Sequence, residues 1–357
     1  PGEFYQLDFE MSFATQEDVF RVGEEVLTAT FEKFAPEGSV VTAAPYPVIS
    51  YKQAMLEFGS DKPDLRNPLR IVDVTDFFQR CTFKPFHGQT VRAIKVSNKM
   101  SKGFHEKLLK FATSIGMGGL GYLEVKEDLS YKGPIDKFIP DDMKAEIREI
   151  AGLKAGDTIF FIADKEKQAA LYAGQLRNEL GQRLDLLEKN AYRFCFINDF
   201  PMYEYDEEQK KIIFTHNPFS MPQGGMDALN NQDPLDILAY QYDLVCNGVE
   251  LSSGAVRNHD PEIMIKAFEL VGLGEDDVKA KFPAMYNAFC YGAPPHAGIA
   301  PGVDRMIMLI CGEESIREII PFPMNKNAMD IMMGAPATVE QKQLDDVHIA
   351  IKMPKED

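Results

Sequence analysis

The chain has 357 residues, 45% apolar and 26% charged, a composition typical of a soluble globular protein that can form two or three domains with hydrophobic cores. The formal net charge of -17 argues against non-specific nucleic-acid binding, which requires a basic surface. No stretch reaches the roughly 18 apolar residues of a membrane span, no signal peptide opens the sequence, and the five cysteines show no C-x-x-C spacing. These features argue against a membrane-spanning protein, and the cysteine pattern argues against a disulfide framework or a zinc site and fits a reducing cytoplasm.

The first predicted element is an amphipathic strand over residues 4–13, FYQLDFEMSF, where apolar and polar side chains alternate. Gln6, Asp8 and Glu10 share its polar face. That face is either solvated or the floor of a polar pocket, and the pattern leaves both open. Because the sequence starts with Pro1 and enters a strand at once, we expect this end to lie inside a longer protein.

Two helices follow. Thr15 and Asp18 have the spacing of a capping box, which predicts a helix that ends before Pro36. We expect its inward-facing side chains to be Val19, Val22, Val26 and Thr30. A shorter helix is predicted over about 51–58, and the turn-rich segment 59–68, GSDKPDLRNP, indicates a domain boundary.

From about 65 to 190 short strands alternate with helices, which predicts an inserted α+β domain. The clearest expected elements are strands over 90–96 and 158–163 and helices over 102–114, 141–151 and 166–180. The glycine-rich run 116–121 leads into a strand instead of a helix, so we interpret it as a plain loop and not as a phosphate-binding loop. The predicted domains are therefore 1–64, 65–190 and 191–357, the first and last forming one domain that carries a C-terminal extension.

The last part returns to predicted strands, at 194–199 and 212–215, and to helices near 261–271 and 303–311. Asp233 is expected to cap a short helix that opens with Pro234 and runs to about Tyr240.

Residues 242–257, YDLVCNGVELSSGAVR, predict a hairpin, because Asn-Gly suits a two-residue type I′ turn. The simplest register pairs Val245 with Glu250 and Asp243 with Ser252. Asp243 and Glu250 are then diagonal neighbours, roughly 7–8 Å apart at the backbone. Such a pair either holds a hard divalent cation or consists of two solvent-facing acids.

Arg257 falls on the opposite face of this hairpin unless a β-bulge intervenes, for which residues 252–254, SSG, offer a place. Further on, Arg305 lies in the first turn of the apolar helix 303–311, which we expect to be buried. A cation is unfavourable there with respect to the helix dipole, so Arg305 either pairs with an acid such as Asp304 or binds a polyphosphate. For His216, just past a strand, a structural and a catalytic role both stay open. No nucleophilic triad is legible.

With these segments the sequence resembles the class II aminoacyl-tRNA synthetases. FYQLDFEMSF is similar to the end of their second signature motif, and GIAPGVDR, residues 298–305, to their third, with Ala300 where a glycine is frequent. GSDKPDLRNP, NDFPMYE, THNPFSMP and NGVELSSGAVR are similar to bacterial aspartyl-tRNA synthetases, and the likeness runs from Pro1 to about Pro336. The family implies an α+β fold: an antiparallel sheet flanked by helices and interrupted by an α+β insertion domain.

The resemblance implies that ATP and L-aspartate form aspartyl-adenylate, whose aspartyl group then passes to the 3′ end of a tRNA. The residues that match the family's ATP-binding positions are Glu250, Gly302, Val303, Asp304 and Arg305. Those that match its aspartate-binding positions are Gln6, Asp8, His216 and Arg257. Asp243 and Glu250 match the Mg²⁺ ligands, and the implied catalytic set is Arg257, Arg305 and Glu250.

The sequence also departs from the family pattern. Asn217 stands where a second histidine is common, which affects how the site closes over the substrate. The anticodon-binding barrel, the first motif and the arginine-bearing start of the second motif are not in this sequence, so we expect little aspartyl-adenylate from this chain alone. For the intact protein the family implies a homodimer acting on aspartate tRNA, with asparagine tRNA left open. The alternatives are a non-catalytic, synthetase-like binding or regulatory protein and a purely structural fragment.

Overall fold

The computed structural model describes residues 3–98 and 100–352. The chain forms two compact units, residues 8–301 and a second made of 1–7 with 302–357. None of the helices in the described part of the chain is long and apolar enough to cross a membrane.

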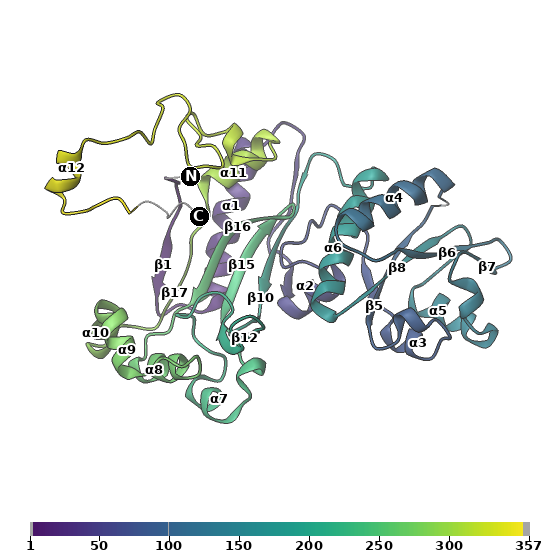
Figure 1. Ribbon diagram of the computed structural model, residues 1–357, viewed down its shortest axis with the longest axis horizontal. Helices are drawn as coiled ribbons and strands as arrows, with labels where there is room; N and C mark the ends of the chain where they lie inside the picture. The colour runs from purple at the N-terminus through teal and green to yellow at the C-terminus, as the bar shows by residue number, and fades with distance from the viewer. Residues whose placement is uncertain (1–2, 99, 353–357) are drawn as a thin grey trace. The chain divides into compact units, whose positions relative to one another are not determined.

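A six-stranded sheet in the order β1-β17-β16-β15-β10-β3 is the main layer of the unit 8–301 (Figure 1). Neighbouring strands are antiparallel except β10 and β3, which are parallel. This arrangement confirms the predicted α+β class with an antiparallel sheet. The strands are β1 (Phe9–Ser12), β3 (Val48–Ser50), β10 (Phe194–Asn198), β15 (Gln241–Cys246), β16 (Val249–Val256) and β17 (His296–Ile299).

β1 is shorter than the predicted strand over 4–13. It pairs with β17 from Phe9 to Ser12, and Phe13 has a positive φ of 56°, which ends the extended run. Upstream, Gln6 forms an isolated β-bridge with Gly302, and both residues belong to the second compact unit. The alternating pattern therefore overestimated the length of the strand.

Helix α1 (Gln16–Phe34) has the predicted capping box, in which the Asp18 N–H donates to Thr15 Oγ1 and the Thr15 N–H donates to Asp18 Oδ2. The prediction of its buried face was wrong except at Val19. The buried residues are Val19, Phe20, Gly23, Leu27 and Phe31, whereas Val22, Val26 and Thr30 are only half-buried. The reason is aromatic packing on the sheet, since the Phe20 ring stacks on Phe196 at 3.9 Å between centroids.

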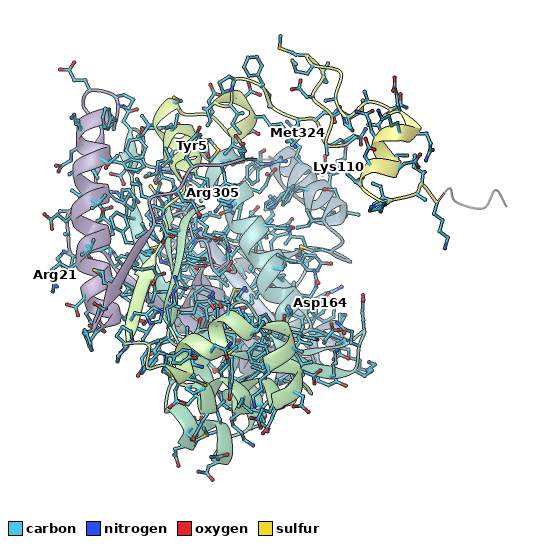
Figure 2. The ribbon with its side chains drawn as sticks, turned by 90° about the vertical axis from the view of Figure 1, so that its left-hand side faces the viewer. Tyr5, Arg21, Lys110, Asp164, Arg305 and Met324 are labelled. Atoms are coloured by element: carbon cyan, nitrogen blue, oxygen red, sulfur yellow. The ribbon has the colours of Figure 1, made fainter. Side chains whose placement is uncertain are left out.

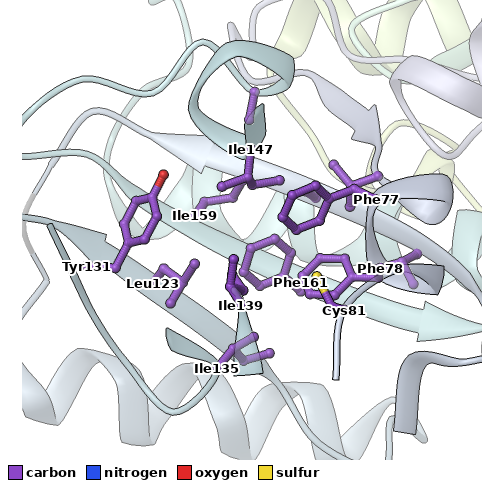
Figure 3. Close-up of a cluster of buried hydrophobic side chains, with 14 of the residues drawn as sticks. Phe77, Phe78, Cys81, Leu123, Tyr131, Ile135, Ile139, Ile147, Ile159 and Phe161 are labelled. Atoms are coloured by element: carbon purple, nitrogen blue, oxygen red, sulfur yellow. The ribbon is translucent and has the colours of Figure 1, made fainter. Parts of the chain in front are cut away.

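A second, five-stranded antiparallel sheet has the order β4-β5-β8-β6-β7. Its strands are β4 (Ile71–Asp73), β5 (Thr90–Val96), β6 (Gly121–Val125), β7 (Tyr131–Lys132) and β8 (Thr158–Asp164). One face packs against α3 (Thr75–Gln79) and α5 (Lys144–Ile150) in a core that includes Phe77, Phe78, Ile147 and Phe161 (Figure 3). The other face packs against α4 (Lys102–Ser114) and α6 (Glu166–Arg183).

The local predictions for this region are largely confirmed. β5 and α4 have the predicted bounds, and the glycine-rich run is a loop before β6. The helix expected over 141–151 begins as a 3₁₀ turn, Asp141–Met143, before α5. The boundaries of the proposed insertion, 65–190, stay a prediction.

The remaining elements of this unit are short. They are β2 (Val40–Val41), α2 (Tyr51–Glu57), β9 (Ala191–Tyr192), β11 (Phe200–Pro201), β12 (Tyr203–Asp206), β13 (Lys211–Phe214), α7 (Gly225–Asn231), β14 (Leu238–Ala239), α8 (Pro261–Glu269), α9 (Glu275–Lys281), α10 (Pro283–Cys290) and 3₁₀ turns at Lys84–Phe86, Asp136–Phe138 and Pro234–Asp236. The helix expected from Pro234 to about Tyr240 is only that last turn, capped by Asp233 as predicted, because the chain enters β14 directly after it.

The loop that follows α2 is fixed to helix α6. Gly59 has a positive φ of 65°, and a Cβ there would lie 2.2 Å from the carbonyl oxygen of Ala170; a Cβ on Gly174 would lie 2.4 Å from the carbonyl oxygen of Gly59. The two backbones can approach this closely only because both residues are glycine. One turn along α6, the buried guanidinium of Arg177 donates to three carbonyl oxygens of the same connection, those of Asp64, Asn67 and Leu69.

The second unit contains α11 (Val303–Cys311), a 3₁₀ turn at Ile316–Glu318 and α12 (Gln341–Asp346). The prediction that α11 is buried was wrong. Only Met306 and Met308 are buried, Ile307 is exposed, and Arg305 is exposed as well.

Candidate active site

A β-bulge decides which side chains of the hairpin share a face. Val245 pairs with Glu250, as predicted, but Leu244 pairs with Ser252, so Leu251 is an extra residue without a partner. The predicted pairing of Asp243 with Ser252 was therefore wrong, and Asp243 pairs with Ser253 instead. The extra residue reverses which side chains of β16 point to each face of the sheet. After Leu251, the odd-numbered residues therefore lie on the same face as Asp243.

Arg257 consequently lies on the face of the acidic pair, as the sequence required for a shared site. A cavity of about 350 Å³ is found there. Most of its lining residues are polar or charged: Lys62, His216, Asn217, Gln241, Asp243, Glu250, Ser253, Gly254 and Arg257.

The two acids of the cavity are joined by one hydroxyl group. Ser253 Oγ lies 2.6 Å from Asp243 Oδ1 and 3.3 Å from Glu250 Oε1. Asp243 is only 4% exposed, and its burial raises the pKa of the carboxyl to about 7, with a further contribution from the charge of Glu250. The Ser253 hydroxyl and the Lys62 ammonium act in the opposite direction on this pKa.

This pair offers the carboxylate oxygens that hard divalent cations take as ligands. Residues 3–98 and 100–352 contain no group of three or more His, Cys, Asp or Glu side chains that could hold a metal ion. Mg²⁺ is, however, commonly held by one or two carboxylates together with substrate phosphates and water. A buried carboxyl whose charge is incompletely compensated, with a second acid beside it, fits such an ion.

The raised pKa of Asp243 predicts a pH dependence of stability. Because the native state binds this proton more tightly than the unfolded state, stability attributable to Asp243 falls as the pH rises from about 4 through about 7. The loss amounts to at most about 4 kcal/mol above pH 7. Urea denaturation at pH 5 and pH 8 should show a smaller difference in free energy of unfolding for Asp243→Asn than for the wild type. An equal difference in both would contradict the assignment.

Lys62 is a site residue that the sequence did not reveal. Its Nζ lies 2.7 Å from Asp61 Oδ2 and 3.3 Å from Glu250 Oε2. It belongs to the loop that follows Gly59, a segment that the sequence indicated as a domain boundary and as part of the family resemblance, without a role for this lysine. A lysine in a turn carries no sequence signal that would connect it to a hairpin far along the chain.

Glu10 is the second residue whose role was not foreseen. Arg257 donates to Glu10 Oε1 from Nη2 at 2.6 Å and from Nε at 3.2 Å. Glu10 pairs with Gly298 across β1 and β17, and a Cβ on Gly298 would lie 2.4 Å from Glu10 Cδ. Gly298, in the segment that resembles the third motif, therefore leaves space for this carboxylate.

Of the other predicted aspartate-binding residues, His216 lines this cavity and Asp8 does not. His216 lines the cavity, with its ring edge-on to Phe200 at 5.3 Å, and burial lowers the pKa of this histidine below its usual value. Asn217 lines the cavity beside it. Asp8 is exposed and is not among the lining residues, because the chain is not yet part of β1 at that position. The structure does not bring Asp8 into this cavity.

The remaining predicted residues lie in the second unit. The Tyr5 N–H donates to Asp304 Oδ2 at 3.0 Å, the Val303 N–H donates to the Tyr5 carbonyl at 2.8 Å, and Gln6 bridges to Gly302. Tyr5 and Asp304 line a cavity of about 810 Å³ whose other walls come mainly from residues 316–328. Arg305 lies on α11 within this unit (Figure 2). No feature of the sequence predicted this cavity.

Comparisons with known proteins agree with the geometry. The family described as tRNA synthetases class II (D, K and N) matches residues 1–326. An aspartate–tRNA(Asp/Asn) ligase from Gluconobacter oxydans is 55% identical over 362 residues, 99% of this chain and 60% of the relative. An aspartate–tRNA ligase from Streptomyces coelicolor is 52% identical over 357 residues, again 99% of this chain and 60% of the relative.

Among solved structures, an asparaginyl-tRNA synthetase from Pyrococcus horikoshii matches at 14% identity with a TM-score of 0.37, covering 90% of this chain and 49% of that one. The chain spans about 60% of the length of the two ligases that it matches.

Proposed function

Because the chain belongs to the class II tRNA synthetases of the D, K and N group, we propose that it is the aspartate-activating part of an aspartate–tRNA ligase. The observation that carries this proposal is the meeting of Arg257 with the acidic pair Asp243 and Glu250 in one polar cavity. A guanidinium beside a divalent-cation site suits a substrate that presents a carboxylate near a metal-bound polyphosphate.

In this proposal Arg257 binds the side-chain carboxylate of L-aspartate in a bidentate manner, and Glu10 orients its guanidinium. His216 contributes to the wall of the same cavity. On the resemblance to the family alone, Gln6 and Asp8 are proposed to contact the substrate's amino group; neither residue lines this cavity. The reaction joins a bound carboxylate to a bound phosphate, so these residues act by positioning and by charge neutralisation. No protein nucleophile is required.

We assign Mg²⁺ to Asp243 and Glu250, where the ion would neutralise charge on the phosphates of ATP. The nucleotide would be held by Glu250 together with the third-motif residues Gly302, Val303, Asp304 and Arg305. The bonds between Tyr5 and the start of α11 support a defined geometry for that segment. The proposed partner of the intact, cytoplasmic and homodimeric protein is aspartate tRNA, with asparagine tRNA as an open second substrate.

The test is thermal melting of the chain with Mg²⁺ and a non-hydrolysable aspartyl-adenylate analogue. At a hundred times its dissociation constant, such a ligand stabilises the native state by about 2.7 kcal/mol, so a clear rise in Tm is expected. The matched controls are the asparaginyl and lysyl analogues, which should give a much smaller shift. No shift with any of them, or equal shifts with all, would contradict the proposed specificity.

A further inference from the structure

The acidic pair already has a cation beside it. Lys62 lines the same cavity as Asp243, and its ammonium lies 3.3 Å from Glu250 Oε2. The pair is substantially shielded, since the Lys62 side chain is 35% exposed and that of Glu250 is 25% exposed. A charge interaction at this depth is stronger than one between fully solvated side chains.

The position of this ammonium is built into the loop. The Lys62 N–H donates to Ser60 Oγ at 3.0 Å, and Asp61 Oδ2 lies 2.7 Å from the Lys62 Nζ. Gly59, at the start of the loop, is in close backbone contact with α6. The loop itself therefore holds Lys62 against the acidic pair. When Glu250 binds another cation, Asp61 remains as an acceptor for the Lys62 ammonium.

We propose that Lys62 is the resident counter-ion of the Asp243–Glu250 pair and makes the site selective for a divalent cation that arrives with a polyphosphate. The inference rests on the function proposed above. A free divalent cation must take Glu250 from the ammonium and then lie beside a positive charge, which weakens its binding. A polyphosphate supplies negative oxygen atoms, so the displaced ammonium gains a new partner and strengthens binding of the complex.

The proposal predicts effects of opposite sign in Lys62→Met. The affinity for Mn²⁺ alone, followed by the electron paramagnetic resonance signal of the free ion, should rise about fivefold. The affinity for Mn²⁺ with inorganic tripolyphosphate, measured by calorimetry, should fall by about the same factor. A lysine that only supports the loop would change both affinities in the same direction, and that result would overturn the inference.

Matched variants separate the possible causes. Lys167→Met makes the same substitution at a lysine that is 90% exposed and paired with Glu204. It does not line the cavity, so this variant should change neither affinity. Lys62→Arg keeps the charge and should retain the preference for the complex. Lys62→Gln repeats the charge removal with a polar side chain in case Lys62→Met fails to fold, and it carries the same prediction.

Asp243→Asn distinguishes failure of this inference from failure of the proposed function. It should weaken binding of Mn²⁺ with tripolyphosphate. If it does so while Lys62→Met leaves both affinities unchanged, the role of Lys62 is wrong and the metal site stands. If Asp243→Asn has no effect on either affinity, the proposed metal site itself is wrong.

Discussion

Replacing Arg177 with leucine is expected to lower the free energy of unfolding by about 3–5 kcal/mol. The Arg177 side chain is 1% exposed and donates to the carbonyl oxygens of Asp64, Asn67 and Leu69 at 2.8 to 3.0 Å. Its guanidinium also lies 5.0 Å from the centroid of the Phe58 ring. Burial lowers the pKa of Arg177 to about 10, so it remains a cation at neutral pH. Leucine fills part of the volume but removes these three short hydrogen bonds. The carbonyl oxygens then keep only longer ones, at 3.2 to 3.3 Å, from Arg70 Nη1 to Asn67 and Leu69 and from the Asn67 N–H to Asp64.

The matched control is Arg183→Leu on the same helix, where Arg183 pairs with Glu179 one turn earlier. That intrahelical pair is half-buried, and a pair with this spacing contributes about 0.5 kcal/mol. Urea denaturation of both variants, with the slope and midpoint fitted separately, measures the difference. Equal destabilisation by the two substitutions would mean that the connection after α2 does not depend on Arg177.

The second large effect is expected at Arg257. Arg257→Ala should weaken binding of the aspartyl-adenylate analogue about 100-fold or more, because truncation of one partner of a shielded charge pair costs about 2–5 kcal/mol. Two causes act together. The substrate carboxylate loses its bidentate partner, and Glu10 is left with a negative charge that repels the ligand.

Two variants control this measurement by calorimetry. Arg257→Lys keeps the charge but not the planar arrangement of donors, so it should recover only part of the affinity. Arg193→Ala removes an arginine that pairs with Glu188 and does not line the cavity, and it should leave the affinity unchanged. If Arg257→Ala binds the analogue as tightly as Arg193→Ala does, Arg257 is not the aspartate ligand.

Features with a strong local cause could be predicted from the sequence. The capping box at Thr15, the Asn247-Gly248 turn and the bounds of α4 each depend on residues within a few positions of one another. The buried face of α1 could not, since it is decided by the aromatic rings of a sheet that the helix meets only in the folded chain. The position of the β-bulge could not be predicted either. The sequence showed that a bulge was needed to bring Arg257 into the site, but it was expected at residues 252–254, one to three residues after its actual position at Leu251.

The candidate site was predicted where residue types carry a chemical signal. Asp243, Glu250, Arg257 and His216 were singled out, and they line one cavity. Glu10 and Lys62 were not recognised, because their importance depends on partners far away in the sequence, 247 residues in the case of Glu10 and Arg257.

The close backbone approach of Gly59 and Gly174 makes the second sheet's helix a structural support of the cavity. The loop that carries Lys62 starts at Gly59, so its course is set by the surface of α6. Excising residues 65–190 to obtain a smaller enzyme would remove that surface together with Arg177. A loss of activity in such a deletion would therefore not identify the excised region as a tRNA-binding element. Conversely, a molecule that shifts α6 from outside would act on the loop that carries Lys62 through the glycine contact and the Arg177 hydrogen bonds.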